Sequence, residues 1–214
     1  MTLRISQLPL GPIETNAYIV NLEGSNQAVV VDPAADAVAI QSSLAHSDLS
    51  CVAIFITHGH WDHLCAVADL ADETGATVYM PVGERDFLEN LSEHVPPGVT
   101  GRSCSPDVLL VGEERLNVAG ISFDVLSVPG HSSAHVAYSA CGHVFSGDVL
   151  FAGSVGRTDL PGADWNTLLA SIRNMLETLA PETVVYPGHG PVTTLGKEFS
   201  SNPFLGDLRI EPER

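Results

Sequence analysis

The stretch THGHWDH, Thr57–His63, follows directly on the apolar run CVAIFI at residues 51–56. One short turn after a predicted strand therefore carries four side chains that can bind a metal: His58, His60, Asp62 and His63. Imidazole nitrogens and carboxylate oxygens suit borderline divalent cations such as zinc, iron or manganese. The spacing differs from the helical HExxH motif, in which both histidines lie on one helix face. Because so many polar groups are costly to bury without a partner, the stretch predicts a metal site.

Three further candidate ligands follow predicted strands elsewhere in the chain. His131 ends SVPGH, Asp148 lies in FSGDVLF, and His189 lies in VVYPGHG. Each comes after a glycine, which lets the backbone adopt a positive φ or approach a metal closely. The complete set of five histidines and two aspartates exceeds what one tetrahedral zinc uses. It suits two metals that share a carboxylate.

The motifs THGHWDH, PGH, SGD and PGHG, in this order, resemble the metallo-β-lactamase superfamily and, within it, the glyoxalase II-like hydrolases. The similarity extends over nearly the whole chain. It includes Asn16 and Tyr18, the VVVDP run that ends at Asp32 and Pro33, the GSVGRTDLPGAD loop and the tail TTLGKEFSSNPFL. The resemblance implies a first metal held by His58, His60 and His131, and a second held by Asp62, His63 and His189. Asp148 would bridge the two metals. The spacing of the motifs gives the set of ligands but not their division between the two metals.

The apolar periodicity predicts a mixed α/β chain with two strand-rich halves, each covered by helices. Helices are expected over residues 35–45, 63–73 (stopped by Gly75), from Pro81 onward, and 164–179. Strands are expected over residues 3–8, 16–22, 28–31, 51–57, 77–80, 108–111, 121–128, 134–138, 143–145 and 183–186, and residues 98–107 read as a surface connection. The family resemblance adds the architecture, an αββα four-layer sandwich of two mixed β-sheets flanked by helices.

Composition limits the partners. A chain of 214 residues with 44% hydrophobic residues most economically forms one domain over residues 1–214. A net charge of −17 with a single lysine argues against nucleic acid or an anionic membrane as a partner, and leaves a small molecule. With no leader pattern or long apolar span, and four cysteines outside any CxxC pair, we expect a cytoplasmic protein. The oligomeric state and the reason for the acidity are not predicted.

The predicted chemistry is hydrolysis with two divalent ions, zinc first and iron or manganese as alternatives. Two cations roughly 3.5 to 4 Å apart lower the pKa of a shared water to about 7, so a bridging hydroxide serves as the nucleophile. Asp62 and Asp148 are the carboxylates expected at this catalytic centre. A thioester fits because a thiol with a pKa of about 8.5 leaves as thiolate without a separate acid. The resemblance implies S-hydroxyacylglutathione or another acyl-thiol as the substrate.

Residues that bind this substrate are harder to identify. Longer glyoxalase II enzymes bind glutathione partly with an extra C-terminal helical domain, and we do not expect that domain after NPFL in this chain. Arg157 is the best anion-binding candidate, with an ion pair to Asp159 as the alternative. Tyr186 flanks a ligand loop and either shapes the pocket or packs in the core. Lys197, in a predicted terminal helix, either binds substrate or is solvated.

A function of another class also fits several motifs. Persulfide dioxygenases share the HxHxDH, PGH and GD elements, but they hold one iron with two histidines and a carboxylate and act on glutathione persulfide. The PGHG motif and the seven filled ligand positions favour the hydrolases. β-Lactamases are disfavoured because they generally lack a carboxylate at the position of Asp148. Asp32 either orients a metal-binding histidine or caps a turn, and no contact with metal is expected of His46, His94, His135 and His143.

Overall fold

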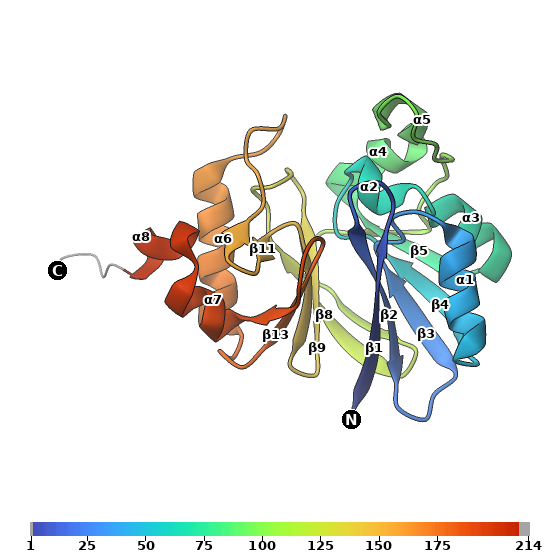
Figure 1. The fold of residues 1–214 in the computed structure, drawn as a ribbon, viewed down its shortest axis with the longest axis horizontal. Coiled ribbons are helices and arrows are strands. Elements are labelled where there is room, and N and C mark those ends of the chain that lie inside the picture. The colour runs from blue at the N-terminus through green and yellow to red at the C-terminus, as the bar shows by residue number, and fades with distance from the viewer. Residues whose placement is uncertain (1, 210–214) are drawn as a thin grey trace.

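The computed structural model describes residues 2–209, so Met1 and residues 210–214 of the expected domain lie outside the described residues. Two six-stranded sheets face each other in the middle of the molecule (Figure 1). Helices α1 and α3 cover the outside of one sheet, and α6 and α7 cover the outside of the other. The αββα sandwich is therefore confirmed. None of the helices in this part of the chain has the length and hydrophobicity needed to cross a bilayer.

The first sheet has the strand order β1-β2-β3-β4-β5-β6. The pairs β1·β2 and β2·β3 are antiparallel, whereas β3 to β6 run parallel. Helices α1 (Ala37–His46) and α3 (Val67–Thr74) make the crossovers that parallel strands require. The strands are β1 (Leu3–Leu10), β2 (Thr15–Leu22), β3 (Gln27–Val31), β4 (Ser50–Phe55), β5 (Thr77–Pro81) and β6 (Val108–Leu110).

The second sheet has the order β14-β13-β10-β9-β8-β7, in which only β10 and β13 are parallel. Its outer face is covered by α6 (Trp165–Thr178) and α7 (Leu195–Ser201), which the short α8 (Gly206–Arg209) follows. The strands are β7 (Arg115–Val118), β8 (Ile121–Ser127), β9 (Val136–Ala140), β10 (His143–Gly147), β13 (Val184–Pro187) and β14 (Thr193–Thr194). A separate hairpin pairs β11 (Leu150–Phe151) with β12 (Ser154–Val155).

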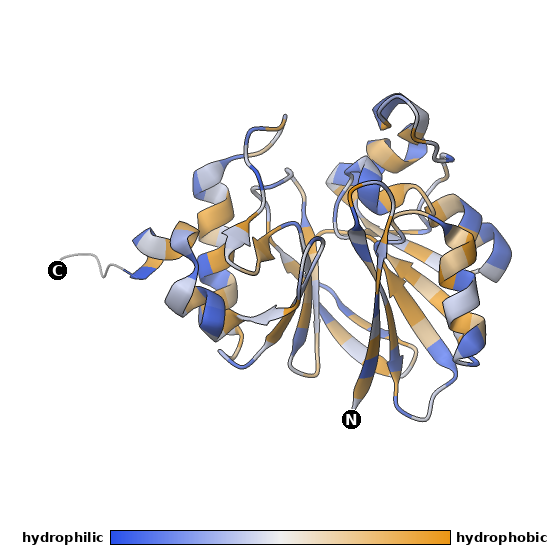
Figure 2. Ribbon diagram, in the orientation of Figure 1, coloured by the Kyte–Doolittle hydropathy of each residue, from blue (hydrophilic) through white to orange (hydrophobic). Residues whose placement is uncertain are grey.

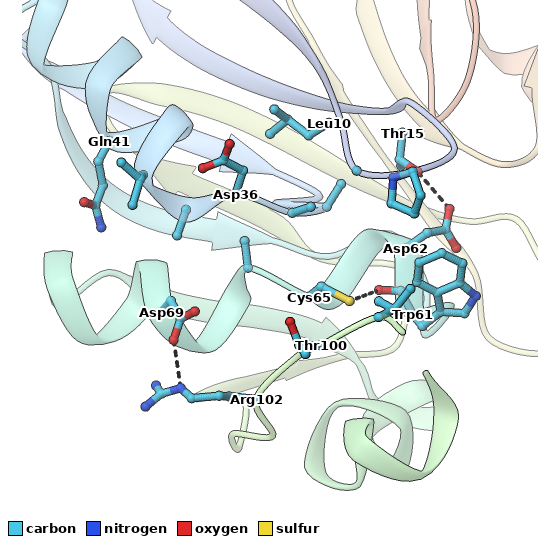
Figure 3. Close-up of a pocket in the computed structure, with 18 of the residues that line it drawn as sticks. Leu10, Thr15, Asp36, Gln41, Trp61, Asp62, Cys65, Asp69, Thr100 and Arg102 are labelled. Atoms are coloured by element: carbon cyan, nitrogen blue, oxygen red, sulfur yellow. Dashed lines mark hydrogen bonds and ion pairs between the residues drawn. The ribbon is translucent and has the colours of Figure 1, made fainter. Parts of the chain in front are cut away.

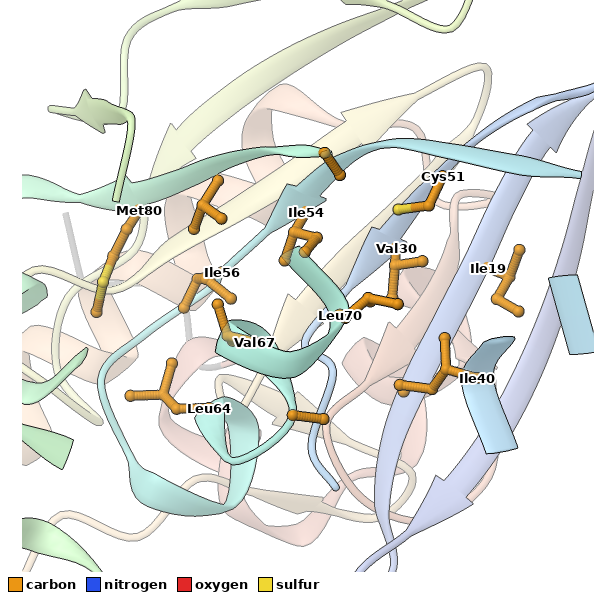
Figure 4. Packing of buried hydrophobic residues seen from close by; sticks show 14 of the residues in the cluster. Ile19, Val30, Ile40, Cys51, Ile54, Ile56, Leu64, Val67, Leu70 and Met80 are labelled. Carbon is orange, nitrogen blue, oxygen red and sulfur yellow. The ribbon is translucent and has the colours of Figure 1, made fainter. Parts of the chain in front are cut away.

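Apolar side chains hold these layers together. Between the sheets, the rings of Phe55 and Tyr138 stack with centroids 4.6 Å apart. Beneath α1 and α3, Ile40, Leu70 and Ile54 of β4 belong to one cluster of buried side chains (Figure 4). Hydrophobic residues run along the strands, while the helices carry both kinds of residue (Figure 2). This pattern is typical of strands that are buried on both faces and of amphipathic helices. The packing of these layers holds in place the strand ends that carry the site.

Two predicted helices differ from the structure. The prediction of a helix that begins at Pro81 is wrong, because Pro81 is the last residue of β5 and has an extended ψ of 133°. A 3₁₀ turn (Val82–Glu84) and two short helices, α4 (Arg85–Glu89) and α5 (Leu91–His94), follow it. The single helix expected over 63–73 is two helices, α2 (Trp61–Leu64) and α3. The break occurs where the Ala66 N–H donates to the Pro33 carbonyl instead of to the helix.

Candidate metal centre

The loops that follow β4, β8, β10 and β13 meet at one end of the sandwich and bring together all seven candidate ligands. Their side-chain atoms form three groups in which all atoms lie within 4.8 Å of one another. We call His58, His60 and His131 the imidazole triad, and Asp62, His63 and His189 the acidic triad. The third group, His58, His63 and Asp148, connects the two triads.

The imidazole triad presents nitrogen lone pairs to one point. His58 Nε2 and His131 Nε2 lie 2.9 and 2.8 Å from His60 Nδ1. His131 Nδ1 lies 2.9 Å from the Arg157 carbonyl, which can only accept, so Nδ1 carries the proton. His58 Nδ1 lies 3.0 Å from the Thr57 hydroxyl, which donates to Asp32, and it therefore also carries the proton. A single proton on His60 cannot satisfy both facing lone pairs, whereas a divalent cation can.

The acidic triad has the same property. His63 Nδ1 donates to Asp32 Oδ2 over 2.9 Å. When the ring is neutral, its Nε2 therefore faces Asp62 Oδ2 and Asp148 Oδ1, each 3.4 Å away, with a lone pair. Within the described residues, neither His63 Nε2 nor Asp148 Oδ1 has a hydrogen-bond partner, although both are buried. Buried acceptors that face one another are costly unless a cation lies between them, so these residues also fit a metal ion.

The Asp148 carboxylate lies between the triads. Its Oδ2 is 3.5 Å from the Nε2 atoms of both His131 and His189, while its Oδ1 faces His63. Gly188 lies directly above it, and a Cβ at that position would overlap Asp148 Oδ1. The glycine of PGHG therefore lets the β13 loop close over the carboxylate.

The two triads have opposite electrostatic character. Burial, reinforced by neighbouring histidines, lowers the pKa of His58 well below its usual value and that of His60 to about 4. Burial also works against a charged His63, but Asp62, Asp148 and Asp32 raise the pKa of His63 well above its usual value. His58 and His60 are thus neutral at pH 7, and a positive charge is favoured among the carboxylates, whether from a proton or from a metal ion.

Several supporting residues hold the ligands in place. The Asp32 carboxylate accepts from Thr57 N (2.8 Å) and Thr57 Oγ1 (2.7 Å) as well as from His63, so it orients a ligand. The Thr15 hydroxyl donates to Asp62 Oδ2 over 2.9 Å. Asn16 Nδ2 donates to the Pro187 and Gly190 carbonyls on either side of His189, which ties the PGHG loop to β2.

The sequence analysis assigned no supporting role to Glu84 or to His135. Glu84 is buried, and its carboxylate accepts from the backbone N–H groups of Gly59 (3.1 Å) and Ala134 (2.9 Å). It thereby links the loop of His58 and His60 to the loop of His131, but nothing near Glu84 in the sequence signals this. His135 belongs to none of the three ligand groups, yet its buried ring stacks on His58 at 4.5 Å and its Nε2 accepts from the Asp148 N–H. In the sequence, the position of His135 four residues after His131 is the feature that could have indicated this role.

A cavity of about 560 Å³ opens onto the candidate ligands. Arg157 lines it, and the guanidinium group makes two 2.7 Å hydrogen bonds to the exposed Asp159 carboxylate. Tyr186 and Lys197 are not among the lining residues. The Tyr186 ring stacks on Phe145 in the core between the sheets, and Lys197 is exposed on α7. Roles for Tyr186 and Lys197 in substrate binding stay predictions.

A second cavity, of about 780 Å³, lies on the far side of Trp61 and Asp62, between α1, α3 and the loop at residues 98–102 (Figure 3). It contains one candidate ligand, Asp62, whose hydrogen bond to Thr15 lies at its edge. The smaller cavity reaches five of the seven candidate ligands and is therefore the one that can admit a reactant to the centre.

Comparison with known proteins agrees with this geometry. The family described as the metallo-beta-lactamase superfamily matches residues 10–189. A probable metallo-hydrolase of Bacillus subtilis, YqgX, is 36% identical over 95% of this chain and 98% of its own length. The hydroxyacylglutathione hydrolase GloC of Haemophilus influenzae is 32% identical over 95% of this chain and 98% of its own length.

Three solved structures are similar to this chain over most of its length. BLEG-1, described as a B3 metallo-beta-lactamase, is 41% identical with a TM-score of 0.89, covering 95% of this chain and 100% of that chain. ETHE1 from Myxococcus xanthus is 32% identical with a TM-score of 0.79, covering 96% and 85%. TTHA1623, solved in a di-iron-bound form, is 39% identical with a TM-score of 0.75, covering 94% and 100%.

Proposed function

The chain belongs to the metallo-β-lactamase superfamily, whose members are generally metal-dependent hydrolases, and from this we propose that it hydrolyses thioesters with two divalent ions, zinc first. The observation that carries the proposal is the position of Asp148. One carboxylate oxygen faces His63 of the acidic triad, and the other lies equally far from His131 and His189. A single side chain thus reaches both triads, as a pair of ions sharing one carboxylate requires. The hydroxyacylglutathione hydrolase among the relatives supports a thioester as the substrate.

Divalent ions at these residues would supply Lewis acidity, which polarises a carbonyl group and makes water acidic enough to attack it near neutral pH. The chain itself keeps the donor atoms in the required protonation state. Asp32 holds the proton of His63 on Nδ1, and the Arg157 carbonyl holds that of His131 on Nδ1. Both Nε2 lone pairs therefore stay available. A thiol with a pKa of about 8.5 departs as thiolate, so no lining side chain has to serve as an acid.

The test combines metal analysis with a substrate panel on one purified sample. We expect close to two ions per chain and hydrolysis of acyl-thiols. The panel contains S-lactoylglutathione, acyl esters of other thiols, glutathione persulfide with an oxygen electrode, and a chromogenic β-lactam, since BLEG-1 is described as a β-lactamase. Protein that carries two ions and leaves every thioester intact would refute the proposal.

The mononuclear iron persulfide dioxygenase remains a second candidate because of one group of side chains. His58, His63 and Asp148 lie within 4.8 Å of one another and offer two imidazoles and a carboxylate. Such a set suits a single iron that activates oxygen. One iron per chain, with oxygen consumed on addition of glutathione persulfide, would select this function over thioester hydrolysis.

A further inference from the structure

The cavity over the metal centre has an apolar wall. Apart from the candidate ligands and Arg157, every residue that lines it is apolar. They come from distant parts of the chain and include Ile13, Phe87, Phe151, Val155, Leu160 and Pro161. Isolated apolar residues at a surface need no explanation, but a concave apolar lining around reactive groups is typical of a binding site for an apolar ligand.

Aromatic rings stand next to both triads. The Phe87 ring lies so close to Gly59, beside His60, that a Cβ there would overlap it. The Phe151 ring meets the His189 ring edge-on, with centroids 6.1 Å apart. Ile13, half exposed, completes the wall at the rim. A carbonyl group held at the ligands therefore has apolar surface within reach on two sides.

The same cavity offers little to an anion. A glutathione thioester carries two carboxylates and one ammonium group. Within residues 2–209, Arg157 is the one arginine or lysine that lines the cavity, and Asp159 neutralises it through two hydrogen bonds. An exposed pair of this kind is weak, but if Arg157 turned away from its partner, the Asp159 carboxylate would be left uncompensated two residues away in the same loop. The net charge of −17 also disfavours the approach of anions.

We propose that the substrate is a thioester with an apolar acyl chain on a thiol without anionic groups, and that glutathione thioesters are poor substrates. The proposal rests on thioester hydrolysis being the function. In the reaction the carbon–sulfur bond breaks and the acyl carbon gains the oxygen of one water. The protons of that water end on the thiol and the carboxylic acid, and nothing is oxidised or reduced. Each methylene buried against the apolar wall should raise kcat/KM roughly fourfold until the wall is covered.

Matched esters test this directly. We would measure kcat/KM for acetyl, butyryl, hexanoyl and octanoyl esters of N-acetylcysteamine, which is neutral, and of glutathione, together with S-lactoylglutathione. The expected result is a rise with chain length in both series and faster hydrolysis of the neutral ester for each acyl group. A rate independent of chain length, or tenfold faster hydrolysis of S-lactoylglutathione than of hexanoyl-N-acetylcysteamine, would overturn the proposal and leave thioester hydrolysis standing. If metal-loaded protein cleaves none of the esters, both proposals fail.

Binding provides a readout that does not depend on turnover. In ketone analogues a methylene replaces the sulfur, so they cannot be hydrolysed. On metal-loaded protein, calorimetry should show the octanoyl analogue binding at least tenfold more tightly than the acetyl analogue, with a negative change in heat capacity. Equal affinities for the two analogues would contradict the apolar assignment.

A charge substitution tests whether the apolar wall of the cavity, rather than the protein surface in general, selects the substrate. Leu160→Lys places a cation in the cavity, within a loop that has no regular secondary structure. It should lower kcat/KM for octanoyl-N-acetylcysteamine at least tenfold and raise it for the glutathione esters. Leu109→Lys is the matched control, because Leu109 is an exposed leucine on β6 outside this cavity, and both substrate series should stay unchanged. An unchanged preference in folded Leu160→Lys would remove the wall from substrate selection.

Discussion

Asp32→Asn tests how the acidic triad is prepared for a metal. The Asp32 carboxylate accepts three hydrogen bonds, from Thr57 N, Thr57 Oγ1 and His63 Nδ1. An amide of the same shape has one oxygen and one NH₂ group, so at least one of these donors would face another donor. Where the NH₂ group takes the place of Oδ2, His63 can relieve that conflict only by accepting at Nδ1, which moves its proton to Nε2.

A proton on His63 Nε2 would weaken metal binding because of where it lies. Nε2 is the atom that lies 3.4 Å from both Asp62 and Asp148, so a proton there competes directly with a cation. Loss of a group that orients a ligand weakens metal binding by roughly 10- to 100-fold. This corresponds to about 1.4 to 2.7 kcal/mol.

The assay is competition with a chelator, which gives the Kd of bound zinc, together with a melting curve to establish that the variant is folded. Asp36→Asn is the matched control. Asp36 has a positive φ, of 51°, and its side chain caps α1. Asparagine caps helices equally well. Its zinc Kd should stay within twofold of the wild-type value. Folded Asp32→Asn with an equally small change would show that Asp32 does not set the His63 tautomer.

Four further substitutions test other parts of the site and the core. Asp148→Ala should abolish hydrolysis and reduce metal content, and full activity in this variant would exclude Asp148 from the mechanism. Glu84→Gln leaves one buried N–H without its acceptor and should cost about 1 to 3 kcal/mol in urea unfolding, whereas Glu89→Gln, which loses only a surface ion pair with Arg85, should cost clearly less. Gly188→Ala should displace the Asp148 carboxylate and release metal, which elemental analysis would detect. Burial raises the pKa of the Cys51 thiol from 9.0 to about 11, so the unfolded chain loses this proton first and the free energy of unfolding falls as pH rises from 9 to 11. In urea unfolding, this decrease should be smaller in Cys51→Ala than in the wild type, by about 2 to 3 kcal/mol.

The sequence analysis found the candidate ligands because each lies in a short motif at a strand end, where local pattern is informative. Most long strands and helices carry enough apolar periodicity to be located within two or three residues. The two-residue strands β11, β12 and β14 have no such pattern and were missed, as was the four-residue strand β7. Pro81 was misassigned because proline suits both a first helical turn and the end of a strand, and only the pairing of β5 with β6 decides between them.

The supporting residues were harder to predict because their partners are remote. Thr15 meets Asp62 across 47 positions of the chain, and Glu84 meets Ala134 across 50. Neither Thr15 nor Glu84 stands in a motif, and a buried carboxylate is indistinguishable in sequence from an exposed one. Asp32 was named with two roles, and the hydrogen bond to His63 selects the orienting one.

The charge distribution of the centre determines how the two candidate functions can be told apart. The imidazole triad offers three nitrogen atoms and no carboxylate, whereas the acidic triad contributes Asp62 and lies against Asp148 and Asp32. A first cation is therefore attracted more strongly to the acidic side. A second cation would then meet repulsion from the first, and Asp148, if shared between the two, is the group placed to offset it. Occupancy of the imidazole triad thus depends on Asp148 reaching both sides at once, so the number of ions per chain discriminates the two-metal hydrolase from the single-iron enzyme more directly than the identity of the metal does.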